Sequence, residues 1–166
     1  AELEVRYADV AIGSDTVRLR TYNGKLVGPV LRAKAGDTLF ITLRNKLPPE
    51  PLAHDLNSFH EWNTTNLHFH GLHVAPQGRP DAESDNVLLE VKPTSDPAGT
   101  VQRYEVHIPS SHVAGTFWYH AHKHGAVAAQ VASGMAGALI IERDDNIHNL
   151  DSVPEVDAAS EEIMVL

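Results

Sequence analysis

Alternation of apolar and polar residues at a period of two runs through much of this chain, and it limits the fold to one built mainly from strands. Leu3 and Val5 alternate with charged residues in the segment 2–7, and the pattern returns at 15–22 and 36–45. Neighbouring side chains of a strand point to opposite faces, so each such segment has one face to bury. Further strand candidates are residues 66–74, 87–91, 102–108, 115–122 and 136–142. Short strands separated by glycine and proline predict an all-β sandwich or barrel.

The segments between these strands give three further expectations. Asn23-Gly24 is a dipeptide typical of a tight hairpin turn. One short helix is predicted at residues 126–134, where two valines lie a helical turn apart before a glycine. Residues 45–65 contain three prolines and form a long loop, which a compact domain tolerates when the loop covers another part of it. Within it, residues 63–65 read Asn-Thr-Thr and fit an N-glycosylation acceptor.

Composition excludes several classes of function. The 166 residues suffice for one domain, and 22 acidic against 13 basic residues give a net charge of −9. This charge repels phosphate backbones and anionic lipids, so we expect neither nucleic-acid nor membrane binding. The N-terminus lacks the features of a signal peptide, as the mature form of an exported protein would. Cysteine is absent from the sequence, so any bound metal must be held by nitrogen and oxygen atoms.

Histidines gather in two short segments of the predicted strands. His68 and His70 are two residues apart and therefore share a face, as do His120 and His122. If the two strands are neighbours, four imidazoles converge on one patch. An all-nitrogen set of ligands favours copper or zinc. Four rings spread along two strands fit a site with several metal ions better than a single tetrahedral ion.

The residues around these pairs are assigned other roles. Phe69 and Ala121 should point to the opposite face, and the aromatic residues at 117–119 are interpreted as packing residues rather than an electron relay. We expect Gly71 and Gly125 to let backbone and metal approach closely. His73 and His124 follow turns. We therefore expect them to contact a metal-binding residue or to lie on the surface, rather than to bind metal themselves. The isolated histidines are predicted to be ordinary surface or loop residues: His54, His60, His107, His112 and His148.

Three motifs carry a family resemblance. The segments HFHGLH (68–73), GTFWYHAH (115–122) and GMAGALII (134–141) resemble the N-terminal cupredoxin domain of the laccase-like multicopper oxidases, and residues 23–47 resemble its opening. The resemblance extends over nearly the whole chain. It implies a cupredoxin-like Greek-key β-sandwich with one short helix, copper as cofactor and dioxygen as electron acceptor. It also implies a secreted or periplasmic protein.

The same resemblance implies roles for individual residues. His68 would bind the type-2 copper of a trinuclear cluster, and His70, His120 and His122 would bind the type-3 pair. Asp85 lies where relatives keep an acid that helps to deliver protons to reduced oxygen, although an aspartate in a surface loop reads the same. The chain departs from the family in having no His-Cys-His segment and no cysteine. It can therefore form no type-1 site, since that site needs a thiolate.

We interpret residues 1–145 as the cupredoxin-like domain, 146–160 as an acidic linker and 161–166 as the first strand of a following domain. On this interpretation, the chain is the N-terminal domain of an oxidase, inactive alone, and its partners are the remaining cupredoxin domains. The alternative is a stand-alone copper- or zinc-binding module, completed by a symmetry-related copy. A third possibility is a structural sandwich with incidental histidines.

Overall fold

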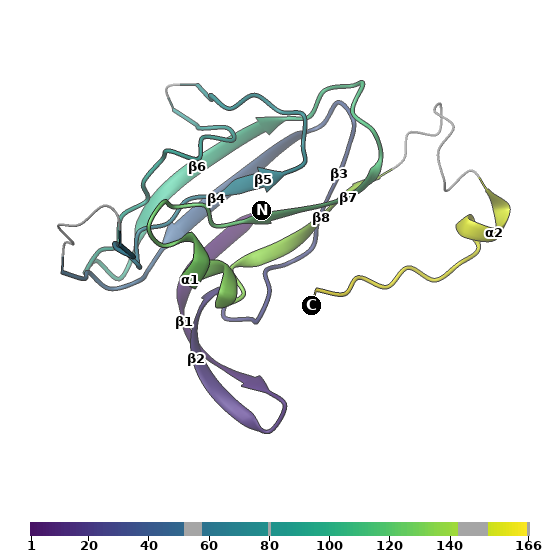
Figure 1. The fold of residues 1–166 in the computed structure, drawn as a ribbon. Coiled ribbons are helices and arrows are strands. Elements are labelled where there is room, and N and C mark those ends of the chain that lie inside the picture. Colours follow the sequence, from purple (N-terminus) through teal and green to yellow (C-terminus); the bar gives the residue numbers. More distant parts are fainter. Residues whose placement is uncertain (52–57, 80, 143–152, 166) are drawn as a thin grey trace.

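Two four-stranded sheets pack face to face in the computed structural model, which describes residues 1–51, 58–79, 81–142 and 153–165 (Figure 1). The first sheet has the strand order β2-β1-β4-β6, and its strands are β1 (Glu2–Ile12), β2 (Asp15–Tyr22), β4 (Thr38–Asn45) and β6 (Thr100–His107). The second has the order β3-β8-β7-β5, and its strands are β3 (Leu31–Lys34), β5 (His68–His70), β7 (Gly115–His120) and β8 (Ala136–Glu142). The predicted all-β sandwich is therefore confirmed.

Each sheet mixes parallel and antiparallel pairs. β1 pairs in parallel with β4, and β3 pairs in parallel with β8. All other pairs are antiparallel, including the β1–β2 hairpin, which projects from the body of the sandwich (Figure 1). Parallel partners need long crossover connections, and these connections bring the two sheets over one another.

The core lies between the sheets and follows the predicted alternation. Leu3 and Val5 of β1 are fully buried, and Leu43 of β4 lies beside them. From the second sheet, Leu139 and Ile141 of β8 complete the apolar layer. Burial of side chains of this size stabilises the fold by about 1.5–3 kcal/mol each.

Three of the strands differ clearly from the prediction, and the bounds of β1, β6 and β7 differ by a few residues. β3 was not predicted, and the candidate strand 66–74 shortens to β5. Residues 87–91 form no strand, and only Val91 makes an isolated bridge, to Thr65. The physical reason is a side chain: the amide of Asn66 donates to the backbone oxygens of Val87 and Leu89, at 2.8 and 3.1 Å. A single side chain thus takes the hydrogen bonds that a neighbouring strand would have supplied.

The predicted turn at Asn23-Gly24 is confirmed. Both residues have positive φ angles, 55° and 74°, and the Lys25 amide donates to the Tyr22 oxygen at 3.2 Å. The residues on either side of the turn, Tyr22 and Lys25, form a single bridge rather than the start of a second strand.

Two short helices accompany the strands. α1 (Val127–Ala132) lies where a helix was predicted. The expectation of one helix is wrong, because α2 (Pro154–Asp157) forms within the predicted linker, with proline in its first turn. Residues 143–152 lie outside the described residues, as does Leu166, and residues 161–165 contain no helix or strand. That this end begins a following domain stays a prediction. None of the described helices is long and apolar enough to cross a membrane.

The described part of the 45–65 loop contacts α1. The buried Gln130 of α1 accepts a hydrogen bond from the Thr65 hydroxyl at 2.9 Å and donates to the Trp62 and Thr64 oxygens, at 3.0 and 2.7 Å. Asn63 is 4% exposed, and its Nδ2 donates to the Pro48 oxygen at 2.9 Å. Since glycosylation needs that nitrogen free, the folded chain does not offer Asn63 as an acceptor.

Candidate metal centre

The two histidine segments lie side by side in the second sheet. β5 and β7 pair antiparallel, with His68 opposite His120 and His70 opposite Trp118. Phe69 and Ala121 point the other way and are 1% and 0% exposed, in the core. The predicted division of the two faces is confirmed. The core face fixes this register, because a slip of one residue would exchange buried and exposed side chains.

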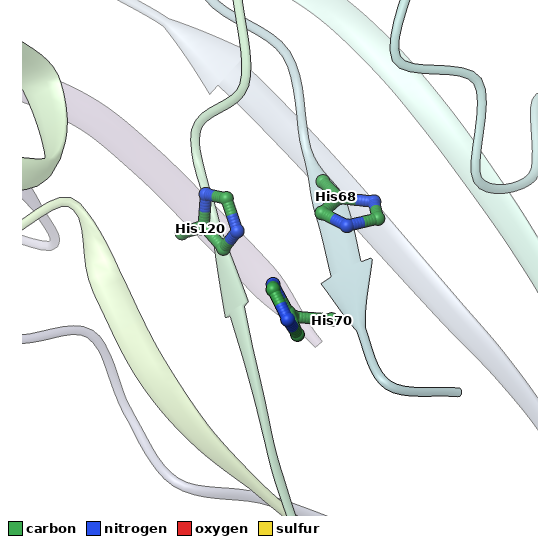
Figure 2. A group of neighbouring side chains, drawn as sticks. All are labelled: His68, His70 and His120. Atoms are coloured by element: carbon green, nitrogen blue, oxygen red, sulfur yellow. The ribbon is translucent and has the colours of Figure 1, made fainter. Parts of the chain in front are cut away.

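Four imidazole rings converge on this patch. One nitrogen each of His68, His70 and His120 lies within 4.8 Å of the others, and Figure 2 shows the three rings turned toward one another from the two strands. The ring of His122 lies 5.0 Å from that of His68 and 5.6 Å from that of His120, centre to centre. The predicted convergence is confirmed for His68, His70 and His120, whereas His122 lies beside His68 and His120 and outside this group of three. Ligation of metal by the four side chains stays a prediction.

Hydrogen bonds define which ring nitrogens face the patch. His68 Nδ1 lies 2.9 Å from Asp85 Oδ1, and His120 Nδ1 lies 2.9 Å from the Ala121 oxygen. Because each Nδ1 meets an acceptor, it carries the proton of the neutral ring, and the Nε2 lone pair is left for a metal. In His68 and His120 the protein itself thus holds the Nδ1 side of the ring.

Unpartnered nitrogens show that the patch fits a cation. Within the described part of the chain, three buried side-chain polar atoms have no hydrogen-bond partner, and two of them are His120 Nε2 and His122 Nδ1. A buried polar atom without a partner costs about 1–3 kcal/mol. Neutral imidazole nitrogen is a donor that copper and zinc prefer. The unmade contacts are therefore those that a metal ion would supply.

Asp85 holds the His68 ring through its Nδ1 atom. Its Oδ1 accepts hydrogen bonds from the Phe69 amide and from His68 Nδ1, both at 2.9 Å. The carboxylate is only 14% exposed. It therefore holds the ring and the backbone of β5 together, which is the arrangement of a carboxylate that orients a metal-binding histidine.

Trp118 stacks on two of the four rings, a contact that the sequence analysis did not foresee. Its ring centre lies 4.9 Å from that of His70 and 4.1 Å from that of His120, at 25° to each. Trp118 is 37% exposed and His70 is exposed as well. The indole restrains the two rings and forms the rim on the open side of the patch.

The remaining histidines divide into three groups. His73, His107 and His124 are exposed, in agreement with the surface positions predicted for them. His60 and His112 lie in loops, as predicted, but they are buried, at 7% and 3% exposed, rather than on the surface. His112 uses both ring nitrogens, one with the Val113 oxygen at 2.9 Å and the other with the His73 amide at 3.1 Å, so it has none left for a metal. His54 and His148 lie outside the described residues.

The two glycines beside the histidine pairs make room for rings of the protein. Gly71 and Gly125 both have φ +88°, and a Cβ atom would lie 3.0 Å from Phe117 and 2.5 Å from His60, respectively. The expectation that these glycines admit the metal stays a prediction. The positive φ and the two ring contacts explain them.

Comparison with known proteins agrees with this site. The family model described as multicopper oxidase matches residues 4–146. The chain belongs to the multicopper oxidase family. Over 131 residues it is 36% identical to the multicopper oxidase mco of Staphylococcus aureus, covering 79% of this chain and 23% of that protein. Over 119 residues it is 33% identical to Laccase-2 of Thanatephorus cucumeris, covering 72% and 16%.

The solved structures agree in fold. A multicopper oxidase from Campylobacter jejuni, described as a metallo-oxidase, superposes with a TM-score of 0.60 at 30% identity, covering 86% of this chain and 25% of that chain. The cupredoxin fold, the relation to laccases and copper as the metal of the family are thus supported. The chain spans a quarter or less of the length of these multicopper oxidases.

Burial favours the neutral form of two histidines of this multicopper oxidase domain. It lowers the pKa of His120 and of His122, and the neighbouring imidazoles lower both further, while the hydrogen bond to Ala121 opposes the shift at His120. A lowered pKa favours the neutral ring, which is the form that binds metal. The folded site is therefore prepared for a metal near neutral pH.

The lowered pKa of His120 predicts how the metal-free protein responds to acid. The folded pKa lies below the unfolded value of about 6.5. The contribution of His120 to the free energy of unfolding is therefore fully present above that pH, and it is lost as the pH falls toward the folded pKa. We expect His120→Gln to reduce the fall in the free energy of unfolding between about pH 8 and pH 5. The measurement is urea unfolding in the presence of EDTA, which keeps the protein free of metal. The control is His107→Gln, which changes an exposed histidine on the other sheet and should keep the wild-type slope.

Proposed function

We propose that this chain is the N-terminal domain of a laccase-like multicopper oxidase and contributes half of the trinuclear copper site at which dioxygen is reduced to water. The observation that carries the proposal is the convergence of four imidazoles from β5, β7 and the residues after β7. Membership of the multicopper oxidase family supports copper as the ion that these nitrogens would hold.

Each histidine has a proposed place. His68 would hold the type-2 copper, and His70, His120 and His122 would hold the type-3 pair. Copper, when bound, supplies the one-electron chemistry through which dioxygen accepts electrons. The protein supplies the arrangement: rings that are already oriented before metal arrives, so that little conformational freedom is lost on binding.

Asp85 is proposed to have two tasks. Its Oδ1 holds the proton of His68 Nδ1 in place and thereby keeps Nε2 free. Oδ1 is occupied by two hydrogen bonds, so Oδ2 is the atom that would carry a proton toward reduced oxygen. The low exposure of the side chain, 14%, favours this role over that of an ordinary surface aspartate.

The site is proposed to be completed by other cupredoxin domains of the parent oxidase. Two of its members, His70 and Trp118, are exposed, and the 166 residues include no cysteine for a blue copper ligand. The oxidase would take electrons at a thiolate-ligated copper that this chain cannot form. We therefore propose that the isolated chain is inactive and that the intact protein works in the secreted or periplasmic space.

Copper titration of the isolated chain tests this proposal. We expect weak uptake of copper by a monomer in native mass spectrometry and no intense blue absorption at any copper loading. We also expect no dioxygen consumption with a phenolic electron donor. Tight, stoichiometric uptake by a stable oligomer would instead support the alternative, a stand-alone copper- or zinc-binding module completed by a second copy.

A further inference from the structure

His122 lies beyond the part of the sheet that could position it. β7 ends at His120, and the last residue pair of β5 and β7 is His68 with His120. The ladder that aligns the other three rings therefore does not extend to His122. Its ring nevertheless lies 5.0 Å from the ring of His68. Other contacts must hold this segment in place.

Asn66 provides the first contact. Its Oδ1 accepts a hydrogen bond from the His122 amide at 2.8 Å, and its Nδ2 donates to the oxygens of Val87 and Leu89. The side chain is fully buried, so loss of any of these bonds would leave a backbone group without a partner. Since Asn66 comes two residues before His68, it fixes the backbone of His122 relative to β5.

Lys123 provides the second contact, on the other side of His122. It is 6% exposed, and its Nζ lies 2.9 Å from Glu61, 3.2 Å from Glu90 and 2.9 Å from the His124 oxygen. A buried lysine is rare, and here three acceptors satisfy the three donors of the ammonium group. The two carboxylates belong to separate segments of the chain, so the lysine ties both of them to the segment that bears His122.

We propose that Asn66, Lys123, Glu61 and Glu90 form a clamp that positions His122 at the metal site before metal is bound. We call these four residues the His122 clamp. They are positioning residues: they reach the site only through the backbone on either side of His122. The inference rests on the proposed role of His122 as a copper ligand, but the clamp can be tested without metal.

The variants must avoid leaving a buried charge unpaired. Lys123→Met alone would leave the partly buried Glu61 without its cation, whereas Glu90 is 39% exposed and keeps its contact with Lys92. The variant of choice therefore combines Lys123→Met with Glu61→Gln and Glu90→Gln, which removes all three charges. Glu90→Gln alone is the second variant, because it leaves Lys123 with one carboxylate and is the milder change. The matched control is Lys92→Met, since Lys92 also contacts Glu90, at 3.6 Å, but is 65% exposed.

The decisive measurement is made on the metal-free chain by NMR. We expect a nuclear Overhauser contact between the ring protons of His68 and His122 in the wild type and in the Lys92→Met control. It should weaken in the triple variant, in which Asn66 still accepts from the His122 amide, and weaken less in Glu90→Gln. The contact between His68 and His120 should persist because the sheet sets it. A His68–His122 contact of wild-type strength in the triple variant, or equal weakening of both contacts, would overturn the clamp.

Copper affinity then connects the clamp to the site. We expect the triple variant to bind copper about 10–100-fold more weakly, the usual effect of residues that orient a ligand. In a His122→Ala background the same changes should cost less than about twofold, since a clamp has no effect without its ligand. An equal loss in both backgrounds would overturn the clamp. If His122→Ala itself leaves affinity unchanged, the proposed ligation by His122 fails, and the NMR result still decides the clamp.

Discussion

Replacing His120 with alanine is expected to weaken copper binding by the chain by more than about 100-fold, a larger effect than loss of a residue that only orients a ligand. His120 Nε2 is buried without a partner, and the ring is held by the Ala121 oxygen and by Trp118. No rotation of another side chain can replace a nitrogen held in this way. The measurement is a competition titration against a chelator of known copper affinity.

The matched control for this variant is His124→Ala. His124 is exposed, and its ring lies 5.7 Å from that of His122. This variant therefore tests whether removing any histidine near the site weakens copper binding. We expect the control to bind copper within about threefold of the wild type. Equal affinity of His120→Ala and the wild type would remove the basis of the proposed site. Metal-free His120→Ala should stay folded, because relief of an unpartnered nitrogen, about 1–3 kcal/mol, offsets part of the lost packing.

Replacing Gly125 with alanine is expected to destabilise the protein by about 2–4 kcal/mol, from positive-φ strain and from overpacking together. Gly125 has φ +88°, and an added Cβ would lie 2.5 Å from the His60 ring. That ring cannot move away freely, since His60 is 7% exposed, its Nδ1 lies 2.7 Å from the Ser58 oxygen and its amide donates to the Gly125 oxygen. The measurement is the free energy of unfolding in urea without metal.

Gly13→Ala separates the two causes. Gly13 also has a positive φ, +60°, but no atom lies within 4 Å of an added Cβ. Gly13→Ala should therefore lower the free energy of unfolding by the cost of the backbone strain alone, about 1 kcal/mol. Similar losses in the two variants would mean that the His60 ring yields to the added methyl group, and the packing explanation for Gly125 would be wrong.

The faces of the strands could be predicted from the sequence, because alternation alone decides which side chains are buried. His68 and His120 were therefore placed on a common face correctly, with Phe69 in the core. The pairing of their strands could only be assumed. The failed strand at 87–91 shows why: its carbonyl groups bond to the side chain of Asn66, and no local pattern reveals such a partner.

Contacts between distant segments explain the other omissions. His60 and His112 read as isolated loop residues, yet folding buries both. Lys123 reads as an ordinary charged residue between two histidines, but its partners come from other parts of the chain. The Trp118 stack could not be foreseen either, because it depends on which residue faces His70 across the sheet. Each omission concerns a partner that sequence spacing does not identify.

The strand order of the second sheet also bears on when this protein can take up copper during its synthesis. Its first strand in the chain, β3, pairs in parallel with its last, β8, and β7 lies between β8 and β5. When strands far apart in the sequence pair, loop-closure entropy is lost before the contacts between them form, and folding is therefore slow. A nascent chain released only as far as β7 would lack the strand against which β7 rests. The proposed copper site is therefore expected to form only after β8 is complete.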